Sequence, residues 1–73
     1  LKTVREVSYQ GYTVREVENG GIEVEEGGEI LSPVKPTLRE LARMLNLSLL
    51  NSNGNPLNTR QLGSHIIKSL SET

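Results

Sequence analysis

The sequence predicts an α+β fold, a three- to four-stranded antiparallel β-meander packed against two C-terminal α-helices. Residues 22–25 alternate apolar and polar side chains with period two, whereas after residue 37 apolar residues recur at helical spacing. Glycine-containing turn signals separate the short strand-like runs before residue 31. The 73 residues suffice for one small domain, which we divide into the meander at 1–31, a proline-containing connector at 32–36 and a two-helix segment at 37–71.

The meander contains the motif Thr-Val-Arg-Glu-Val twice, at 3–7 and 13–17. Gln10-Gly11 lies between the copies and predicts a two-residue turn, because glycine adopts positive φ without penalty. Asn-Gly-Gly at 19–21 predicts the next hairpin, and 29–31 predicts a short last strand. The valines of each copy are three residues apart, so we expect a β-bulge or burial of both faces.

The first helix is predicted to begin at Thr37, because Thr37 and Glu40 have the spacing of a capping box. Its apolar stripe consists of Leu38, Leu41, Ala42 and Leu45. Asn46 is expected to end the helix, since asparagine tolerates the left-handed conformation.

The second helix is predicted to begin at Asn58, with Gln61 completing a capping box and Leu57 and Leu62 forming a hydrophobic staple. Its buried stripe is expected to be Leu62, Ile66, Ile67 and Leu70. Gly63 falls on the same stripe, where the missing side chain would let another backbone approach closely.

The composition excludes most catalytic and metal-binding chemistry. The chain has no cysteine, no aspartate and a single histidine, so disulfides and thiolate metal sites are excluded. Ser64 and His65 are adjacent on a helix and project about 100° apart, so they do not form a nucleophile–base pair. We therefore expect no enzyme, no catalytic residue, no metal and no cofactor.

Two other clusters have a functional and a structural interpretation. The carboxylates of Glu23, Glu25, Glu26 and Glu29 can be ligands of a hard cation, or a solvated edge that discourages strand pairing. Tyr9 and Tyr12 can form a stacking platform for a base, or a cross-strand pair that fixes the register. We favour the structural interpretation of both.

Charge is unevenly distributed along the chain. Residues 1–36 carry a net charge of −3 and residues 37–73 a net charge of +2. Any phosphate-binding surface is therefore expected in the second half. No segment approaches the roughly 20 apolar residues of a membrane span, and no signal-peptide pattern is present. We expect a cytoplasmic protein without membrane contact.

The polar faces of the two helices provide the candidate site residues. Six side chains suit contacts with nucleic acid, namely Arg60, Gln61, Ser64, Lys68, Arg39 and Arg43. Arginine reads guanine edges, glutamine reads adenine, and lysine contacts phosphate. The alternative is that these residues are only the solvated face of two amphipathic helices.

Residues 38–47 resemble the first helix of a helix-turn-helix, with leucines around a small Ala42 and with Asn46 where that family usually has glycine. Residues 37–70 also resemble a SAP-type helix–extended loop–helix module, because Leu47-Ser48 follows the first helix and Gly54 lies in the loop. The lysines usual after that glycine are replaced by Asn55-Pro56. Both resemblances imply DNA binding.

The leading hypothesis is a small DNA-binding domain, regulatory or associated with a mobile element. It would bind double-stranded DNA through the last helix and the preceding asparagine-rich loop. The alternative is a protein–protein interaction module, or a small inhibitor or adaptor, without nucleic-acid binding. The oligomeric state is left open.

Overall fold

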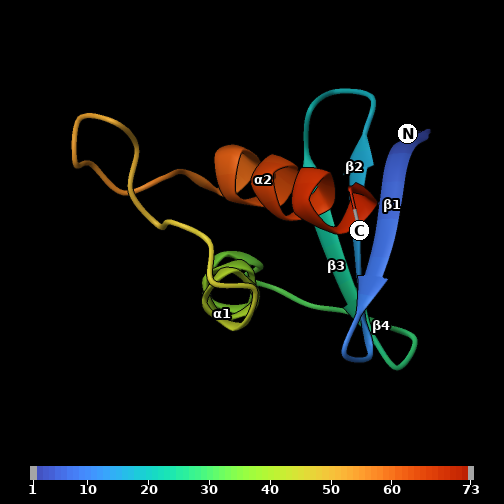
Figure 1. Cartoon of the computed structure of the whole chain (residues 1–73). Helices are drawn as coiled ribbons and strands as arrows, with labels where there is room; N and C mark the ends of the chain where they lie inside the picture. Colours follow the sequence, from blue (N-terminus) through green and yellow to red (C-terminus); the bar gives the residue numbers. More distant parts are fainter. Residues whose placement is uncertain (1, 73) are drawn as a thin grey trace.

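The computed structural model describes residues 2–72 and confirms the predicted α+β fold (Figure 1). An antiparallel sheet in the order β1-β2-β3-β4 precedes two helices. Its strands are β1 (Thr3–Tyr9), β2 (Tyr12–Val17), β3 (Ile22–Glu26) and β4 (Glu29–Ile30), and the helices are α1 (Lys35–Met44) and α2 (Thr59–Ser71). Among residues 2–72, no helix combines the length and the apolar character needed to cross a membrane.

The first hairpin has the predicted two-residue turn. Gln10 and Gly11 both have positive φ, 51° and 83°, as a turn that matches the twist of the flanking strands requires. Tyr9 and Tyr12 face each other across it, and both pack against the core. In the first copy of the motif the register with β2 shifts between Thr3 and Arg5, an irregularity of the kind expected there, and in the second copy both Val14 and Val17 are buried.

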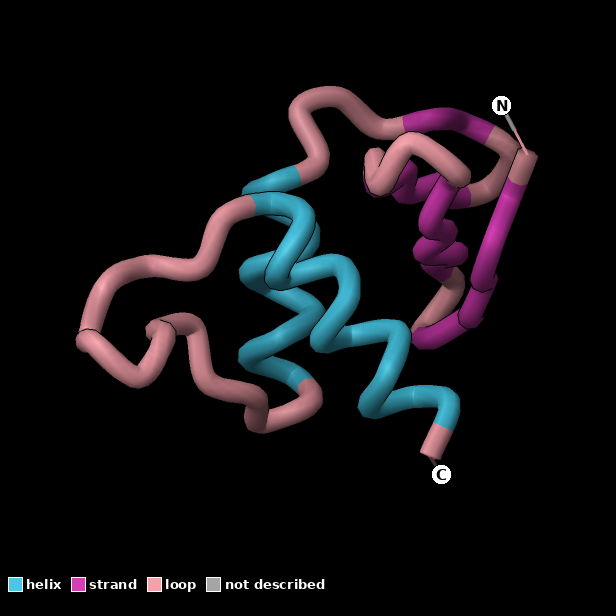
Figure 2. The backbone as a smooth tube through the Cα atoms, turned by 90° about the horizontal axis from the view of Figure 1, so that it is seen from above, coloured by secondary structure: helices cyan, strands magenta, loops and turns pink. Residues whose placement is uncertain are grey.

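Helix α2 covers one face of the sheet, and α1 packs mainly against α2 (Figure 2). Helix α2 contacts β1, β2 and β3, and its side chains Leu62, Ile66 and Ile67 are buried. Leu57 and Leu62, the predicted staple, both belong to the core. The core is wholly aliphatic, and its buried residues are Val14, Val24, Leu38, Leu41, Ala42, Leu57, Leu62, Ile66 and Ile67.

The predicted start of the first helix is wrong. Helix α1 begins at Lys35, its N-cap is Val34, and no side chain caps it. Pro36 lies in the first turn, where its missing N–H needs no partner and its fixed φ already suits a helix. Thr37 therefore lies inside the helix rather than at its cap. The predicted connector at 32–36 is also too long, because Lys35 and Pro36 belong to α1. The Ser32–Pro33 peptide bond is cis.

Helix α1 ends as predicted. Asn46 adopts φ 60°, and the backbone N–H of Leu47 donates to the Ala42 carbonyl oxygen at 2.8 Å. Residues 45–58 then form a long loop that projects from the body of the molecule (Figures 1 and 2).

Asn51 organises this loop. Its Oδ1 accepts from the backbone N–H groups of Asn53 at 2.9 Å and Asn55 at 3.0 Å. An isolated β-bridge joins Leu50 to Pro56. The asparagine-rich segment is thus a closed turn on a narrow stem.

Gly63 is buried on the sheet-facing side of α2, as its place on the stripe predicted. The predicted neighbour is wrong, because Gly63 meets the side chain of Ile22 on β3 rather than another backbone.

Candidate nucleic-acid interface

Helix α2 begins with the capping box that the sequence predicts. The Asn58 Oδ1 accepts from the Gln61 backbone N–H at 2.8 Å, and the Gln61 Oε1 accepts from the Asn58 backbone N–H at 3.1 Å. Two of the helix-end donors are thereby satisfied, which fixes where the polar face of α2 begins.

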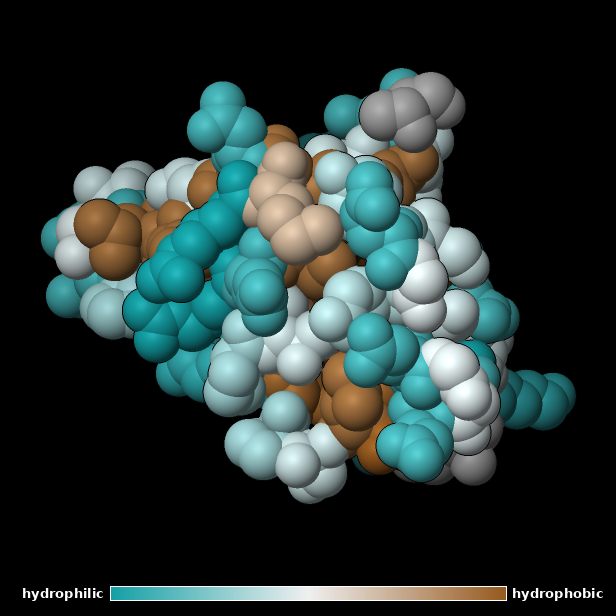
Figure 3. All heavy atoms as spheres, turned by 90° about the horizontal axis from the view of Figure 1, so that it is seen from below, coloured by the Kyte–Doolittle hydropathy of each residue, from teal (hydrophilic) through white to brown (hydrophobic). Residues whose placement is uncertain are grey.

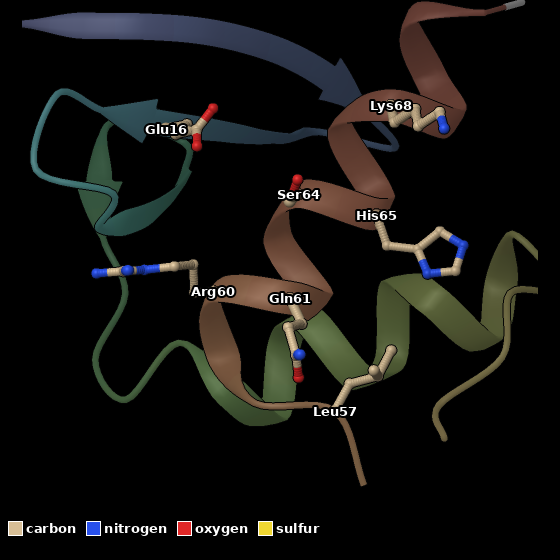
Figure 4. Close-up of a pocket in the computed structure, with 7 residues that line it drawn as sticks. All are labelled: Glu16, Leu57, Arg60, Gln61, Ser64, His65 and Lys68. Carbon is tan, nitrogen blue, oxygen red and sulfur yellow. The ribbon is translucent and has the colours of Figure 1, made fainter. Parts of the chain in front are cut away.

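A groove of about 520 Å³ follows the exposed face of α2 (Figure 4). It is lined by Glu16, Leu57, Arg60, Gln61, Ser64, His65 and Lys68. The structure thus brings together all four site residues predicted on this helix, namely Arg60, Gln61, Ser64 and Lys68. Within the groove, Arg60 and His65 point in opposite directions (Figure 4).

Arg60 is held against the β2–β3 turn. Its Nη2 donates to the Asn19 carbonyl oxygen at 3.3 Å, and a Cβ on Gly20 would lie 2.8 Å from the guanidinium carbon of Arg60. Only one of the five guanidinium N–H donors is engaged in this bond. The side chain is therefore held in place while most of its donors stay free for a ligand.

Gln61 is more constrained than its residue type suggests. Adenine recognition uses both the oxygen and the nitrogen of a carboxamide. Since the Gln61 Oε1 already accepts the capping hydrogen bond, the amide nitrogen is the better available group.

Ser64 connects the groove to the sheet. Arg5 of β1 donates through Nη2 to the Ser64 Oγ at 3.3 Å and through Nε to the Glu16 Oε1 at 2.7 Å. Sequence reasoning missed Glu16 as a groove residue. The repeated motif could have predicted the Arg5–Glu16 pair, because antiparallel pairing of its two copies sets these residues opposite each other.

The α1 candidates lie beside this groove rather than in it. Arg39 lines a second groove of about 550 Å³, between α1 and the long loop. Leu57 lines both grooves, so they adjoin. Arg43 is exposed in the last turn of α1 and lines neither groove.

The cations of the sheet are largely neutralised, whereas those of the helices are not. Arg5 pairs with Glu16, and Arg15 lies 3.3–3.7 Å from Glu6, Glu23 and Glu25. Glu25 and Glu6 raise the pKa of Arg15, chiefly through the hydrogen bond to Glu25.

Within residues 2–72, five helical cations form no ion pair, namely Lys35, Arg39, Arg43, Arg60 and Lys68. Only Glu40 and Glu72 offset them in residues 35–72, which gives this part a net charge of +3. The part before it, residues 2–34, carries a net charge of −4. The two layers of the fold therefore have opposite charge.

The described residues contain no group of three or more histidine, cysteine, aspartate or glutamate side chains arranged to hold a metal ion. Comparison with known proteins found no matching family model, no matching curated sequence and no matching solved structure.

Proposed function

We propose that the protein binds double-stranded DNA through its helical layer, in a regulatory or mobile-element setting within the cytoplasm. The observation that carries the proposal is the separation of charge. The sheet cations are engaged in ion pairs, whereas the helical cations are exposed without such partners and are available to phosphates.

The two helices have different roles in this proposal. Arg39 and Arg43 are one turn apart on α1 and contact phosphates, which position the duplex without reading its sequence. Arg60 lies in the first turn of α2 and contacts base edges with its remaining donors, and Lys68 contacts phosphate further along the helix. The turn at 51–56 contacts the backbone through amide groups.

The test is fluorescence anisotropy with a labelled mixed-sequence duplex at about 50 and about 200 mM salt. The wild type is expected to bind at the lower salt and to weaken steeply at the higher. The Arg39→Ala/Arg43→Ala variant should bind all sequences less tightly, with a salt slope lower by about two.

Lys2→Ala is the matched control, because Lys2 is an exposed cation in the acidic part of the chain. Glu23→Ala should leave affinity unchanged or raise it slightly. If the wild type does not bind near 50 mM salt, the DNA proposal is wrong and the interaction module replaces it.

A further inference from the structure

The groove between α1 and the long loop has an apolar floor and a basic rim. Its lining residues are Lys35, Arg39, Ser48, Leu49, Leu50, Pro56, Leu57 and Leu62, with no carboxylate among them. Lys35 and Arg39 are four residues apart on α1, and both are exposed. Leu50 is 51% exposed, so a large aliphatic side chain of the groove is left in water.

The β3–β4 hairpin has the complementary chemistry. Ile30 is 56% exposed, and the carboxylates of Glu26 and Glu29 are exposed beside it. Neither carboxylate forms an ion pair with a described residue. The hairpin and the long loop project on opposite sides of the molecule, so one chain cannot bring its own hairpin to its own groove (Figure 1).

We propose that this groove binds the β3–β4 hairpin of a second copy of the chain. Ile30 of one copy enters the groove and covers Leu50 of the other. Glu26 and Glu29 then lie against Lys35 and Arg39. The second copy is the occupant because its hairpin presents both an exposed aliphatic side chain and the charge opposite to that of the rim.

The contact joins two different surfaces, so it is head-to-tail, and each dimer leaves the hairpin of one copy and the groove of the other free. Such a small contact gives weak association that grows with protein concentration. Opposite charges at its rim make it weaken with added salt. On the face seen from below, apolar side chains form separate patches among hydrophilic ones, which favours a local contact over a broad one (Figure 3). This inference does not depend on DNA binding.

Sedimentation velocity without DNA tests the proposal. The mean mass of the wild type should rise with concentration at low salt and fall back when salt is added. The hairpin variant Ile30→Ser and the groove variant Lys35→Glu/Arg39→Glu should each remain monomeric. Met44→Ser is the matched control, because Met44 is an apolar residue of α1, 47% exposed, that does not line the groove. Circular dichroism checks that every variant is folded.

Mixing the two variants is the decisive measurement. The groove variant keeps its hairpin and Ile30→Ser keeps its groove, so the mixture should form one-to-one dimers and nothing larger. A monomeric wild type at every concentration would overturn the proposal. So would association that both variants retain, since it would use another surface. Binding of a labelled peptide of residues 26–31 to a wild type that does not self-associate would assign the groove to a different protein.

Discussion

Gly63 of α2 lies directly against the side chain of Ile22 on β3. A Cβ built on Gly63 would be 2.5 Å from the Ile22 Cγ1 and 2.6 Å from its Cδ1. Both distances are too short for two carbon atoms, so this glycine sets how closely α2 approaches the sheet. The same contact sets the distance between the sheet and the polar face of α2, which lies on the opposite side of the helix.

The substitution Gly63→Ala is therefore expected to lower the free energy of unfolding by about 1–3 kcal/mol, because the added methyl group overpacks the helix–sheet contact. Urea denaturation measures the effect. Combined with Ile22→Ala, Gly63→Ala should cost less than it does in the wild type, because the smaller side chain makes room for the methyl group. Ser71→Ala on the exposed end of α2 is the control. A Gly63→Ala protein more stable than the wild type would contradict the close contact.

Leu41 and Ile66 are 1% and 0% exposed and belong to the single core beneath the sheet. Leu41→Ala or Ile66→Ala should each cost about 2–5 kcal/mol. Strand and helix signals should melt together in circular dichroism, since short helices and an uncovered meander are each marginal alone. Met44→Ala provides an exposed control. Separate melting of the two halves would show that they are not one cooperative unit.

Asn58→Ala should lower the free energy of unfolding by about 1 kcal/mol, because it removes the side-chain acceptor at the start of α2. Thermal denaturation measures this loss, and Asn58→Ser should retain most of the stability. Gln61→Glu keeps an acceptor for the Asn58 N–H and should also be close to wild type. Equal stability of Asn58→Ala and wild type would argue against the capping box.

Arg60→Ala should weaken binding to a preferred DNA site by about 1–3 kcal/mol and relax the sequence preference. Arg60→Lys should not restore the preference, because an ammonium lacks the planar fork that binds guanine through two hydrogen bonds. Competition with a panel of duplexes in fluorescence anisotropy measures both effects. If both variants keep the wild-type preference, Arg60 only ties α2 to the β2–β3 turn.

The carboxylate of Glu26 raises the pKa of Tyr12 above its ordinary value of 10.0. A pKa that is higher in the folded state favours the neutral phenol. Its contribution to stability is therefore present below the unfolded value and is lost as pH rises through the folded value.

Glu26→Gln should lower the pKa of Tyr12 and reduce the loss of stability as pH rises above about pH 10. Tyrosinate absorbance in a Tyr9→Phe background follows the single remaining phenol. An unchanged titration curve in Glu26→Gln would rule out Glu26 as the cause.

The strand turns and the start of α2 were predictable because each is encoded within a few residues. Gln10-Gly11 provides the backbone freedom of a tight turn, and Asn58 and Gln61 satisfy each other across a single helical turn. The same local reasoning failed at Thr37. The expected capping box of Thr37 does not form. Pro36 favours the first turn of a helix, so α1 begins at Lys35 and includes Thr37.

The sequence by itself determined the order of strands and helices, the aliphatic core and the polar face of α2, because periodicity decides which side of an element is buried. Only the tertiary structure decided which partners those polar residues meet. Arg60 reaches Asn19 across 41 residues and Arg5 reaches Ser64 across 59. Such contacts depend on how α2 lies on the sheet, and the packing of Gly63 on Ile22 sets that position through close approach in space rather than through any local pattern.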